Sequence, residues 1–412
     1  MWRMFAEMTS QRCGRKTLMP DQPLSSVRVL DLSTIIAGPL TASLLGDFGA
    51  DVIKIEQPGY GDPARHYPPL IRDLSAAWAM HGRNKKSVTL DLRHDEAPNL
   101  VGRLAEKADV VVTNFRPATL KRFRIDFEDL VKHKSDLVMV HISAFGRSGP
   151  YAHRPGFARV AEGYAGLTYR TGDSDGPPMF AGYPVADGVT GIYAAFAALL
   201  ALRQRDLTGE PQLADIPLYE PLLRMMEDFV TDYGVTGASV ERQGNKNPHI
   251  SPNSMYQTRD SEWIALPAST ERMWERLVDV MEEPELKDYG SLSSRLEHRD
   301  EVEARVADFV RAHDSEELLE KLSKARVAAG PINSAEQVCN DPHIRARGSI
   351  VEVDDGVGGT RLVQAPAGRF SGFSSTLGGP PPMLGENTDA VFEELGGLDT
   401  DDIADLRSRN VI

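Results

Sequence analysis

The stretch VRVLDLSTIIAGPLTASLLGDFGADVIKIEQP, residues 27–58, decides the fold class. Its first part, VRVLDLS, has the composition of a strand. PLTASLLGDFGA then predicts a helix that begins at a proline and ends at a glycine. DVIKIEQP predicts the next strand. A helix between two strands is typical of a parallel sheet, so this stretch predicts an α/β fold.

The same alternation continues as far as residue 145. Further strands are expected at 86–92, 109–115 and 136–146, and further helices at 97–108 and 117–123. This order predicts a doubly wound, largely parallel sheet. A longer helix is expected at 187–204, where alanine and leucine dominate and no glycine or proline follows Gly191.

The character of the chain changes near residue 245. Amphipathic helices with one densely charged face are expected at 270–281, 300–313 and 315–327. A chain of 412 residues is also longer than one compact core usually needs. Both observations predict a second, smaller domain in this region.

The net charge of −14 bounds the possible partners. It disfavours nucleic acid and anionic membranes, so a polyanionic ligand would need a local basic pocket. Basic residues gather in two places near strand ends: Arg83, Lys85, Lys86 and Arg93, and then Arg116, Lys121, Arg122 and Arg124. Each group fits either a phosphorylated ligand or a solvated helix face, and both interpretations stay open.

Several common sites have no sequence signature here. Cys13 and Cys339 are the only cysteines and the histidines are scattered, which predicts neither disulfides nor a metal site and favours the reducing cytoplasm. GxGxxG, P-loop and GxSxG motifs do not occur. The apolar run 192–202 is too short to span a bilayer. Residues 1–22 lack the apolar core of a secretory signal; a frayed tail, a presequence and an upstream start all remain open.

One carboxylate stands out because it lies alone just before the longest apolar run. Asp187 is followed by Gly188 and Gly191. It fits a helix N-cap, which is the more ordinary interpretation. It also fits a covalent nucleophile, for which the glycines would leave room and offer N–H groups to an oxyanion. The two interpretations are compatible.

Together with six further stretches, the sequence resembles the class III CoA-transferases. The further stretches are GRNKKSVTLDLR, ADVVVTNFRPATLKRF, ISAFGRSGPYAHRPGF, ADGVTG, AAGPINSAEQV and PPMLGENT. This is the family of formyl-CoA transferase and carnitine CoA-transferase (the CaiB/BaiF type). The resemblance implies a Rossmann-like large domain, a smaller α+β domain and an interlocked ring dimer. It places an extension at 1–22, the large domain at 23–225, the small domain with linkers at 226–335, and a return to the large domain at 336–412.

The resemblance also implies an activity. CoA would pass from an acyl-CoA to a carboxylic acid through a mixed anhydride and a thioester on Asp187, without metal, ATP or a tightly bound cofactor, and with the CoA thioester as substrate. The implied CoA contacts are Ile36, Ala37, Leu90, Asp91, Leu92, Arg93, Asn114, Phe115, Arg122 and Phe157. The implied partners are the two substrates and a second copy of the chain, with no nucleic acid or membrane.

The chain departs from the family pattern at three places. Gln57 stands where some relatives have arginine, Ala158 stands where many have an acid, and GNKNPHISPNSMYQT replaces the glycine-rich loop of formyl-CoA transferase. A dicarboxylic acid such as succinate is therefore expected in place of formyl-CoA and oxalate. Two alternatives remain: an α-methylacyl-CoA racemase, whose histidine would occupy position 157 where this chain has Phe157, and a non-catalytic CoA-binding dimer.

Overall fold

The computed structural model describes residues 22–356 and 358–412, so nearly all of the expected extension at 1–22 lies outside the described residues. The described chain forms two compact units. The larger takes the residues up to Ala161 together with Val185–Pro221 and Gly348–Ile412, and the smaller takes Glu162–Pro184 and Leu222–Arg347. The predicted boundaries differ in three ways: residues 162–184 belong to the smaller unit, its second segment begins at Leu222 instead of residue 226, and that segment ends at Arg347 instead of residue 335.

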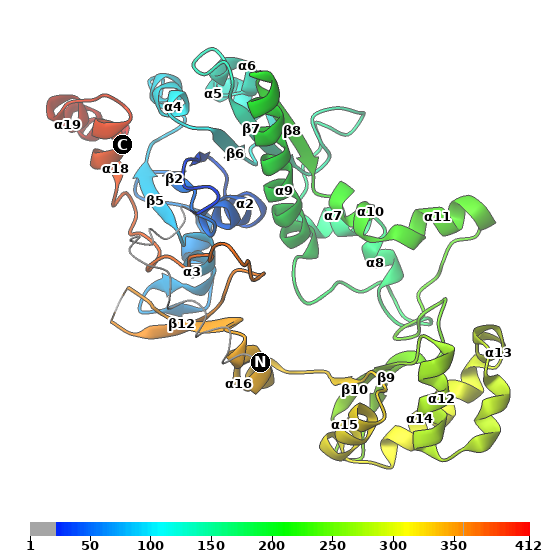
Figure 1. The fold of residues 1–412 in the computed structure, drawn as a ribbon. Helices are drawn as coiled ribbons and strands as arrows, with labels where there is room; N and C mark the ends of the chain where they lie inside the picture. Colours follow the sequence, from blue (N-terminus) through cyan, green and yellow to red (C-terminus); the bar gives the residue numbers. More distant parts are fainter. Residues whose placement is uncertain (1–21, 357) are drawn as a thin grey trace, which may run out of the picture. The chain divides into compact units, whose positions relative to one another are not determined.

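The larger unit is a six-stranded sheet with helices on both faces (Figure 1). Its strands are β1 (Arg28–Asp31), β2 (Asp51–Glu56), β5 (Lys85–Thr89), β6 (Val110–Thr113), β7 (Val138–Ser143) and β8 (Gln212–Pro217). Its helices include α2 (Ala37–Gly46), α3 (Ala76–His81), α4 (Ala97–Glu106), α5 (Pro117–Phe123), α6 (Phe127–Leu130), α9 (Val185–Thr208), α18 (Thr388–Glu394) and α19 (Thr400–Ser408). Smaller elements are η1 (Pro63–His66) and the hairpins β3 (Leu70–Ile71) with β4 (Leu74–Ser75) and β12 (Ile350–Asp354) with β13 (Thr360–Gln364). Helices α7 (Ala158–Tyr164) and α10 (Glu220–Met225) each cross a boundary between the units.

Every pairing in the central sheet is parallel, and the strand order is β5-β2-β1-β6-β7-β8. Numbered along the chain this is 3-2-1-4-5-6, the order of doubly wound α/β folds. The order reverses between β1 and β6, whose carboxyl ends lie side by side because they pair directly. The expected α/β class with a parallel sheet is confirmed, and ligands of such sheets bind beyond these carboxyl ends.

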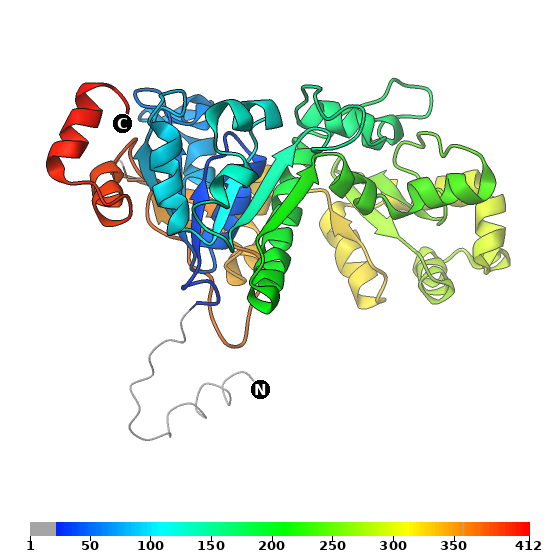
Figure 2. The ribbon, with the colours of Figure 1, turned by 90° about the horizontal axis from the view of Figure 1, so that it is seen from above.

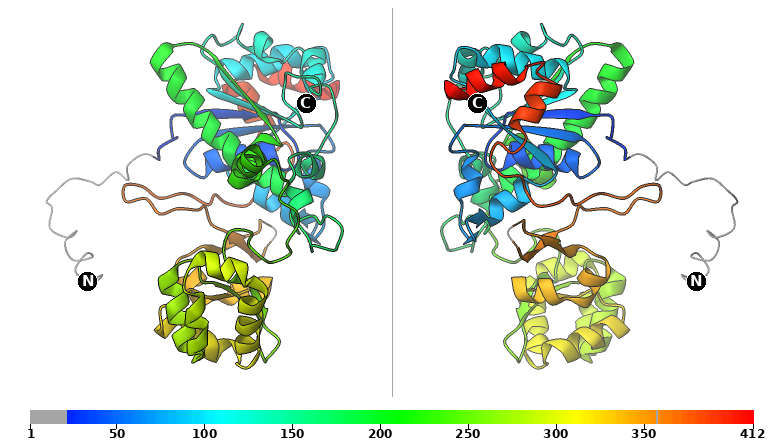
Figure 3. Two further views of the ribbon diagram at one scale, coloured as in Figure 1. Left: turned by 90° about the vertical axis from the view of Figure 1, so that its right-hand side faces the viewer. Right: turned by 90° about the vertical axis from the view of Figure 1, so that its left-hand side faces the viewer.

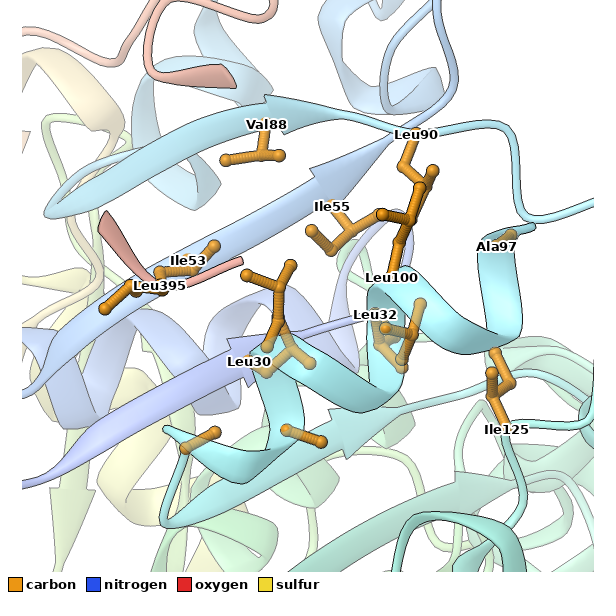
Figure 4. Packing of buried hydrophobic residues seen from close by; sticks show 14 of the residues in the cluster. Leu30, Leu32, Ile53, Ile55, Val88, Leu90, Ala97, Leu100, Ile125 and Leu395 are labelled. Carbon is orange, nitrogen blue, oxygen red and sulfur yellow. The ribbon is translucent and has the colours of Figure 1, made fainter. Parts of the chain in front are cut away.

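An apolar core fills one face of the sheet. Leu30, Ile53 and Val88 of neighbouring strands belong to one buried cluster with Leu100 of α4 and Leu395 (Figure 4). The C-terminal helices α18 and α19 close the same core through residues such as Phe392, so the end of the chain packs against its beginning. Strands β1, β6 and β7 are almost fully buried, which is why apolar residues predominate in them.

Helices α2 and α9 cover the other face, with α9 running along β7 and β8 (Figure 2). The two helices approach closely at Gly191, where a Cβ would lie 2.8 Å from Leu40 Cδ2 and 3.0 Å from the Ala37 carbonyl oxygen. Thr41 Oγ1 donates to the Gly191 carbonyl at 3.1 Å across the same contact. α9 is long and apolar enough to cross a membrane by length and composition, yet half of its most apolar window is buried in the protein.

Charged side chains are buried on the α2 face of the sheet. Lys54 and Lys85 are fully buried beside Asp31, at 3.8 and 2.7 Å. Burial alone would raise the pKa of Asp31, but the two ammonium groups together lower it. Burial lowers the pKa of Lys85 to about 8, although Asp31 opposes that change. These groups retain their charges because each one faces an opposite charge or a carbonyl oxygen.

His81, at the end of α3, makes the stability of this face depend on pH. Burial, reinforced by the positive charges of Lys85 and Arg83, lowers the pKa of His81 from 6.5 to about 4. Between pH 6.5 and 4 the unfolded chain therefore takes up a proton that the folded chain refuses, so stability is lost as the pH falls through this window. We expect the free energy of unfolding to fall by up to about 3 kcal/mol from this residue alone.

Urea unfolding of His81→Gln at pH 7 and pH 4.5 checks this expectation. The substituted glutamine cannot take up the proton, so the variant should lose less stability between the two pH values than the wild-type protein does. His153→Gln removes an exposed histidine and serves as the matched control, with the wild-type pH response retained. Equal losses in the wild-type protein and His81→Gln would contradict the expectation.

The smaller unit surrounds a three-stranded antiparallel sheet with helices (Figure 3). Its core centres on Trp274 and Leu277 of α12, Ile264 of β10 and Val306 of α14. Its elements are α8 (Leu167–Arg170), α11 (Glu227–Thr236), β9 (Asn253–Gln257), β10 (Trp263–Pro267), α12 (Glu271–Met281), η2 (Pro284–Tyr289), α13 (Leu292–Glu297), α14 (Arg299–Arg311), α15 (Ser315–Lys324), β11 (Gly330–Pro331), α16 (Ala335–Asn340) and α17 (Pro342–Ala346).

Candidate active site

Three cavities follow one another along the carboxyl edge of the central sheet. The edge cavity, about 220 Å³, lies beyond the ends of β1, β2, β5 and β6. The arginine cavity, about 500 Å³, shares Leu92, Arg93 and Phe123 with it. The Asp187 cavity, about 130 Å³, shares Thr34 with the edge cavity. A ligand with several parts therefore finds a continuous row of sites where doubly wound folds bind their ligands.

Asp187 is the third residue of α9, inside the first turn, so it is not the N-cap that the sequence indicated. Its side chain is partly exposed and lines the Asp187 cavity together with Ile36, Ala37, Asn114 and Phe157. Phe157 is 72% exposed. These five residues come from four separate segments of the chain, and the fold brings them to one place.

The other expected CoA contacts lie in the neighbouring cavities. Leu90, Asp91, Leu92, Arg93 and Phe115 line the edge cavity, and Arg122 lines the arginine cavity. Arg93 is exposed and donates to both oxygens of Asp91, at 2.8 and 3.0 Å. This bond and the positive charge of Arg93 lower the pKa of Asp91. The carboxylate thus stays ionised and holds the guanidinium at the cavity mouth.

The first basic group predicted from the sequence is not a phosphate site. Arg83 donates to both carboxylate oxygens of Asp47, Lys85 is buried on Asp31, and Lys86 lies 2.7 Å from Asp51. All three lie at the amino end of β5, whereas the cavities open at carboxyl ends. Of that group only Arg93 reaches a cavity. Arg122 and Arg124, from the second group, join it in the arginine cavity.

The two glycines after Asp187 do not supply oxyanion donors. Gly188 and Gly191 are the fourth and seventh residues of α9, and N–H groups at those positions bond to carbonyls one turn back. Only the N–H groups in the first turn of a helix lie outside its own ladder of hydrogen bonds. Gly191 is instead required by the close approach of α2 described above.

Asn114 lines the Asp187 cavity, but its amide group is engaged within the protein. Its Oδ1 accepts from the Thr34 N–H at 2.9 Å, and its Nδ2 donates to the Thr34 carbonyl at 2.8 Å. The next residue, Ile35, has φ of +74°. For a β-branched side chain this left-handed conformation costs about 1–3 kcal/mol. The turn between β1 and α2 is therefore strained, and residues outside the turn, such as Asn114, hold it in place.

Sequence reasoning missed several residues of these cavities. They are Thr34, Ile35, Tyr60, Asp62, Phe123, Ile142, Ser143, Ala144, Gly156 and Leu218. Ser143 ends β7 and Leu218 directly follows β8, so the rule that ligands bind beyond carboxyl ends would have found both. Thr34 and Ile35, in the turn after β1, have no comparable sequence signal, because their positions depend on hydrogen bonds to distant side chains.

The described residues of the smaller unit contain one group that was not expected from the sequence. Asp228, Asp232 and His249 place ligand atoms within 4.8 Å of one another. Asp228 also accepts two hydrogen bonds from Arg170, at 2.8 and 3.0 Å, and this guanidinium lowers the pKa of Asp228. The protein's own cation therefore balances this acidic pair.

The chain is similar to known CoA-transferases. The family model described as CoA-transferase family III matches residues 24–388. Succinyl-CoA–D-citramalate CoA-transferase of Chloroflexus aurantiacus is 36% identical over 98% of this chain and 100% of its own. Succinate–glutarate CoA-transferase of Agrobacterium fabrum is 34% identical over 92% of this chain and 98% of its own.

Solved structures agree as well. A CAIB/BAIF family protein from Brucella suis has a TM-score of 0.81 and 31% identity, covering 91% of this chain and 100% of its own. Rv3272 from Mycobacterium tuberculosis has a TM-score of 0.79 and 28% identity, covering 90% and 99%. The resemblance drawn from the sequence is confirmed: the chain belongs to CoA-transferase family III.

Proposed function

We propose that this enzyme moves CoA from succinyl-CoA, or a similar acyl-CoA, to a dicarboxylic acid through covalent intermediates on Asp187. One observation carries the proposal. The carboxylate lies in a cavity that adjoins, through Thr34, the row of cavities lined by the expected CoA contacts. A CoA thioester bound along the edge of the sheet would bring its acyl end to Asp187. Rossmann-like domains also bind their ligands beyond the carboxyl ends of the sheet strands.

The first half of the reaction loads the enzyme. The Asp187 carboxylate attacks the thioester carbonyl, and the resulting tetrahedral oxyanion collapses by expelling CoA as a thiolate. This leaves a mixed anhydride between Asp187 and the donor acid. The thiolate then attacks the aspartyl carbonyl of the anhydride, forms a thioester on Asp187 and releases the donor acid as a carboxylate. Splitting the transfer in this way replaces one difficult step by easier ones.

The second half runs the same steps in reverse with the acceptor. The acceptor carboxylate attacks the aspartyl thioester and expels CoA thiolate. This leaves a new mixed anhydride between the acceptor acid and Asp187. The thiolate then attacks the acceptor's carbonyl, so acyl-CoA leaves and Asp187 returns as a carboxylate. Every bond broken is matched by one formed, so neither ATP nor metal enters the balance.

Two helix N-termini meet at this cavity. Ile36 and Ala37 begin α2, which has no side-chain N-cap, and Asp187 lies in the first turn of α9. The amino end of a helix favours negative charge, both on the carboxylate and on a developing oxyanion. This pair of helix ends replaces the two glycines in the oxyanion role predicted from the sequence.

Two observations favour a small dicarboxylic acid. The relatives that match the chain are named for succinate, glutarate, malate, mesaconate and citramalate. The Asp187 cavity, at about 130 Å³, is smaller than the 300–1,000 Å³ typical of drug-sized ligands. The described residues that line it include no histidine, which disfavours the racemase alternative.

Donor and acceptor exchange tests the proposal. We expect succinyl-CoA incubated with C4 and C5 dicarboxylic acids to give the acceptor's CoA ester and free succinate, measured by mass spectrometry. Monocarboxylic acids of equal chain length are the matched acceptors and should react more slowly. Deuterium exchange at the α-carbon without acid exchange would point to the racemase. CoA binding without either reaction would point to a non-catalytic binding protein.

We also propose that two copies of the chain form a dimer through α9. The side of this helix turned away from α2 carries Ile192, Tyr193, Phe196, Leu199, Leu200 and Leu207, which are 39–62% exposed. Their spacing places them on one helical face. A contiguous apolar face of this kind marks an interaction surface.

With Cys339 free and only two cysteines in the chain, the reducing cytoplasm is the compartment we infer.

A further inference from the structure

Residues 33–36, the turn between β1 and α2, form a wall shared by two of the cavities. Thr34 lines both the edge cavity and the Asp187 cavity, and Ile35 and Ile36 line the latter. At Gly38 a Cβ would overlap the Ser33 side chain, so the turn packs tightly on the first turn of α2. Any movement of this turn would change the wall that joins the CoA cavities to Asp187.

Three residues of the turn are held by different parts of the chain. Ser33 donates its N–H to Asp31 Oδ1 at 3.0 Å, and its carbonyl oxygen accepts from Lys54 Nζ. Thr34 is clamped on both sides by Asn114. Ile35, in its left-handed conformation, donates its N–H to the two carboxylate oxygens of Asp62, at 3.1 and 3.3 Å.

Asp62 is itself fixed from several directions. Its carboxylate lies 3.2 Å from the buried Lys54 and accepts from the Ala64 N–H at 2.8 Å, and its own N–H donates to Glu56 at 2.8 Å. Asp62 is 2% exposed. A buried carboxylate that is fixed in this way gives the Ile35 N–H a rigid acceptor and opposes the steric preference of Ile35 for negative φ.

We infer that Asp62 is a positioning residue for CoA transfer: its carboxylate holds Ile35 in the left-handed conformation and thereby sets the wall between the CoA cavities and Asp187. The inference rests on the proposed function, because it assigns Asp62 a role in that reaction. A small misplacement of a wall beside the reacting groups is enough to cost a large factor in rate.

The test is a double-mutant cycle of Asp62→Ala with Ile35→Gly. In the wild-type background we expect Asp62→Ala to lower kcat/KM about ten- to a hundredfold, mainly through kcat. In the Ile35→Gly background we expect the same change to cost less than about threefold, because glycine adopts positive φ without strain and no longer needs the carboxylate. A residue that acts only on overall stability would give the same cost in both backgrounds.

Ile36→Gly is the matched control. It makes the same side-chain change at the next residue, where φ is −122°, so glycine relieves no strain there. Asp62→Ala should keep its full cost in this background. Asp62→Asn retains an oxygen acceptor and should lose less activity than Asp62→Ala. Equal costs of Asp62→Ala in all three backgrounds would overturn the inference. Full activity of Asp62→Ala in the wild-type background would overturn it as well.

CoA dissociation constants from calorimetry complete the cycle and separate the two proposals. A wild-type protein that exchanges no acid overturns the proposed function. The cycle then applies to CoA affinity, where we expect the same recovery in the Ile35→Gly background. A wild-type protein that exchanges acids, with an additive cycle in both readouts, overturns the positioning role alone.

Discussion

Asp187→Asn is expected to abolish CoA transfer while CoA still binds. The amide has nearly the same shape as the carboxylate but cannot form an anhydride, so the covalent route is closed. Loss of a covalent nucleophile costs on the order of 10⁴- to 10⁶-fold in kcat. The affinity for CoA should change by less than about tenfold, because six of the ten expected CoA contacts lie in the edge and arginine cavities, away from Asp187.

Trapping the intermediate gives the direct measurement. Wild-type protein incubated with succinyl-CoA and quenched with hydroxylamine should carry a hydroxamate on the peptide that contains Asp187. Asp187→Asn should carry none. Asp206→Asn changes an exposed carboxylate at the far end of the same helix and should behave as wild type in both assays. Transfer at the wild-type rate by Asp187→Asn, or a hydroxamate on another residue, would contradict the proposed mechanism.

The sequence predicted the inner strands of the sheet well because apolar residues predominate in them. Strands such as β1 and β6 are buried on both faces, so runs of valine, isoleucine and leucine predict them directly. The carboxyl-edge rule then places Asn114 and Phe115 at the site without knowledge of any contact. The site residues expected from the sequence, from Ile36 to Asp187, meet at the carboxyl edge because all strands of the sheet run in the same direction.

Where the sequence was misleading, the cause is tertiary. The basic run Arg83–Lys85–Lys86 fits a phosphate site by composition as well as a solvated face, but its partners Asp47, Asp31 and Asp51 lie on neighbouring segments. Composition cannot tell which end of a strand faces a cavity. Residues 162–184 join the smaller unit for a similar reason, because only long-range packing determines which core a connecting segment joins.

The strained turn shows a further limit. Isoleucine at position 35 has a strong preference for negative φ, so local reasoning predicts an ordinary extended turn. The N–H of Ile35 donates to Asp62, 27 residues along the chain, and the preceding Thr34 is bonded to Asn114, 80 residues from it. Local rules fail where a functional site holds the chain in a strained state, and here that place is the wall beside Asp187.

Asp substitutions at Phe196 and Leu200 together are expected to convert the proposed dimer into monomers. Both side chains are more than half exposed on the apolar face of α9, so the single chain loses little packing by the change. In a twofold dimer each substitution counts twice. Full burial of a large apolar side chain is worth about 1.5–3 kcal/mol, and about half of each side chain is exposed in the single chain, so the four lost contacts weaken association by about 3–6 kcal/mol.

That loss corresponds to about a hundred- to ten-thousandfold rise in the dissociation constant, and the new carboxylates repel one another across the twofold axis. Size-exclusion chromatography with light scattering measures the result, with circular dichroism to show that the helices persist. Gln204→Asp with Thr208→Asp is the matched control, because it adds the same charges at the same four-residue spacing outside the apolar face. The control should remain dimeric. A wild-type protein that is monomeric, or a Phe196→Asp/Leu200→Asp protein that stays dimeric, would show that α9 does not carry the interface.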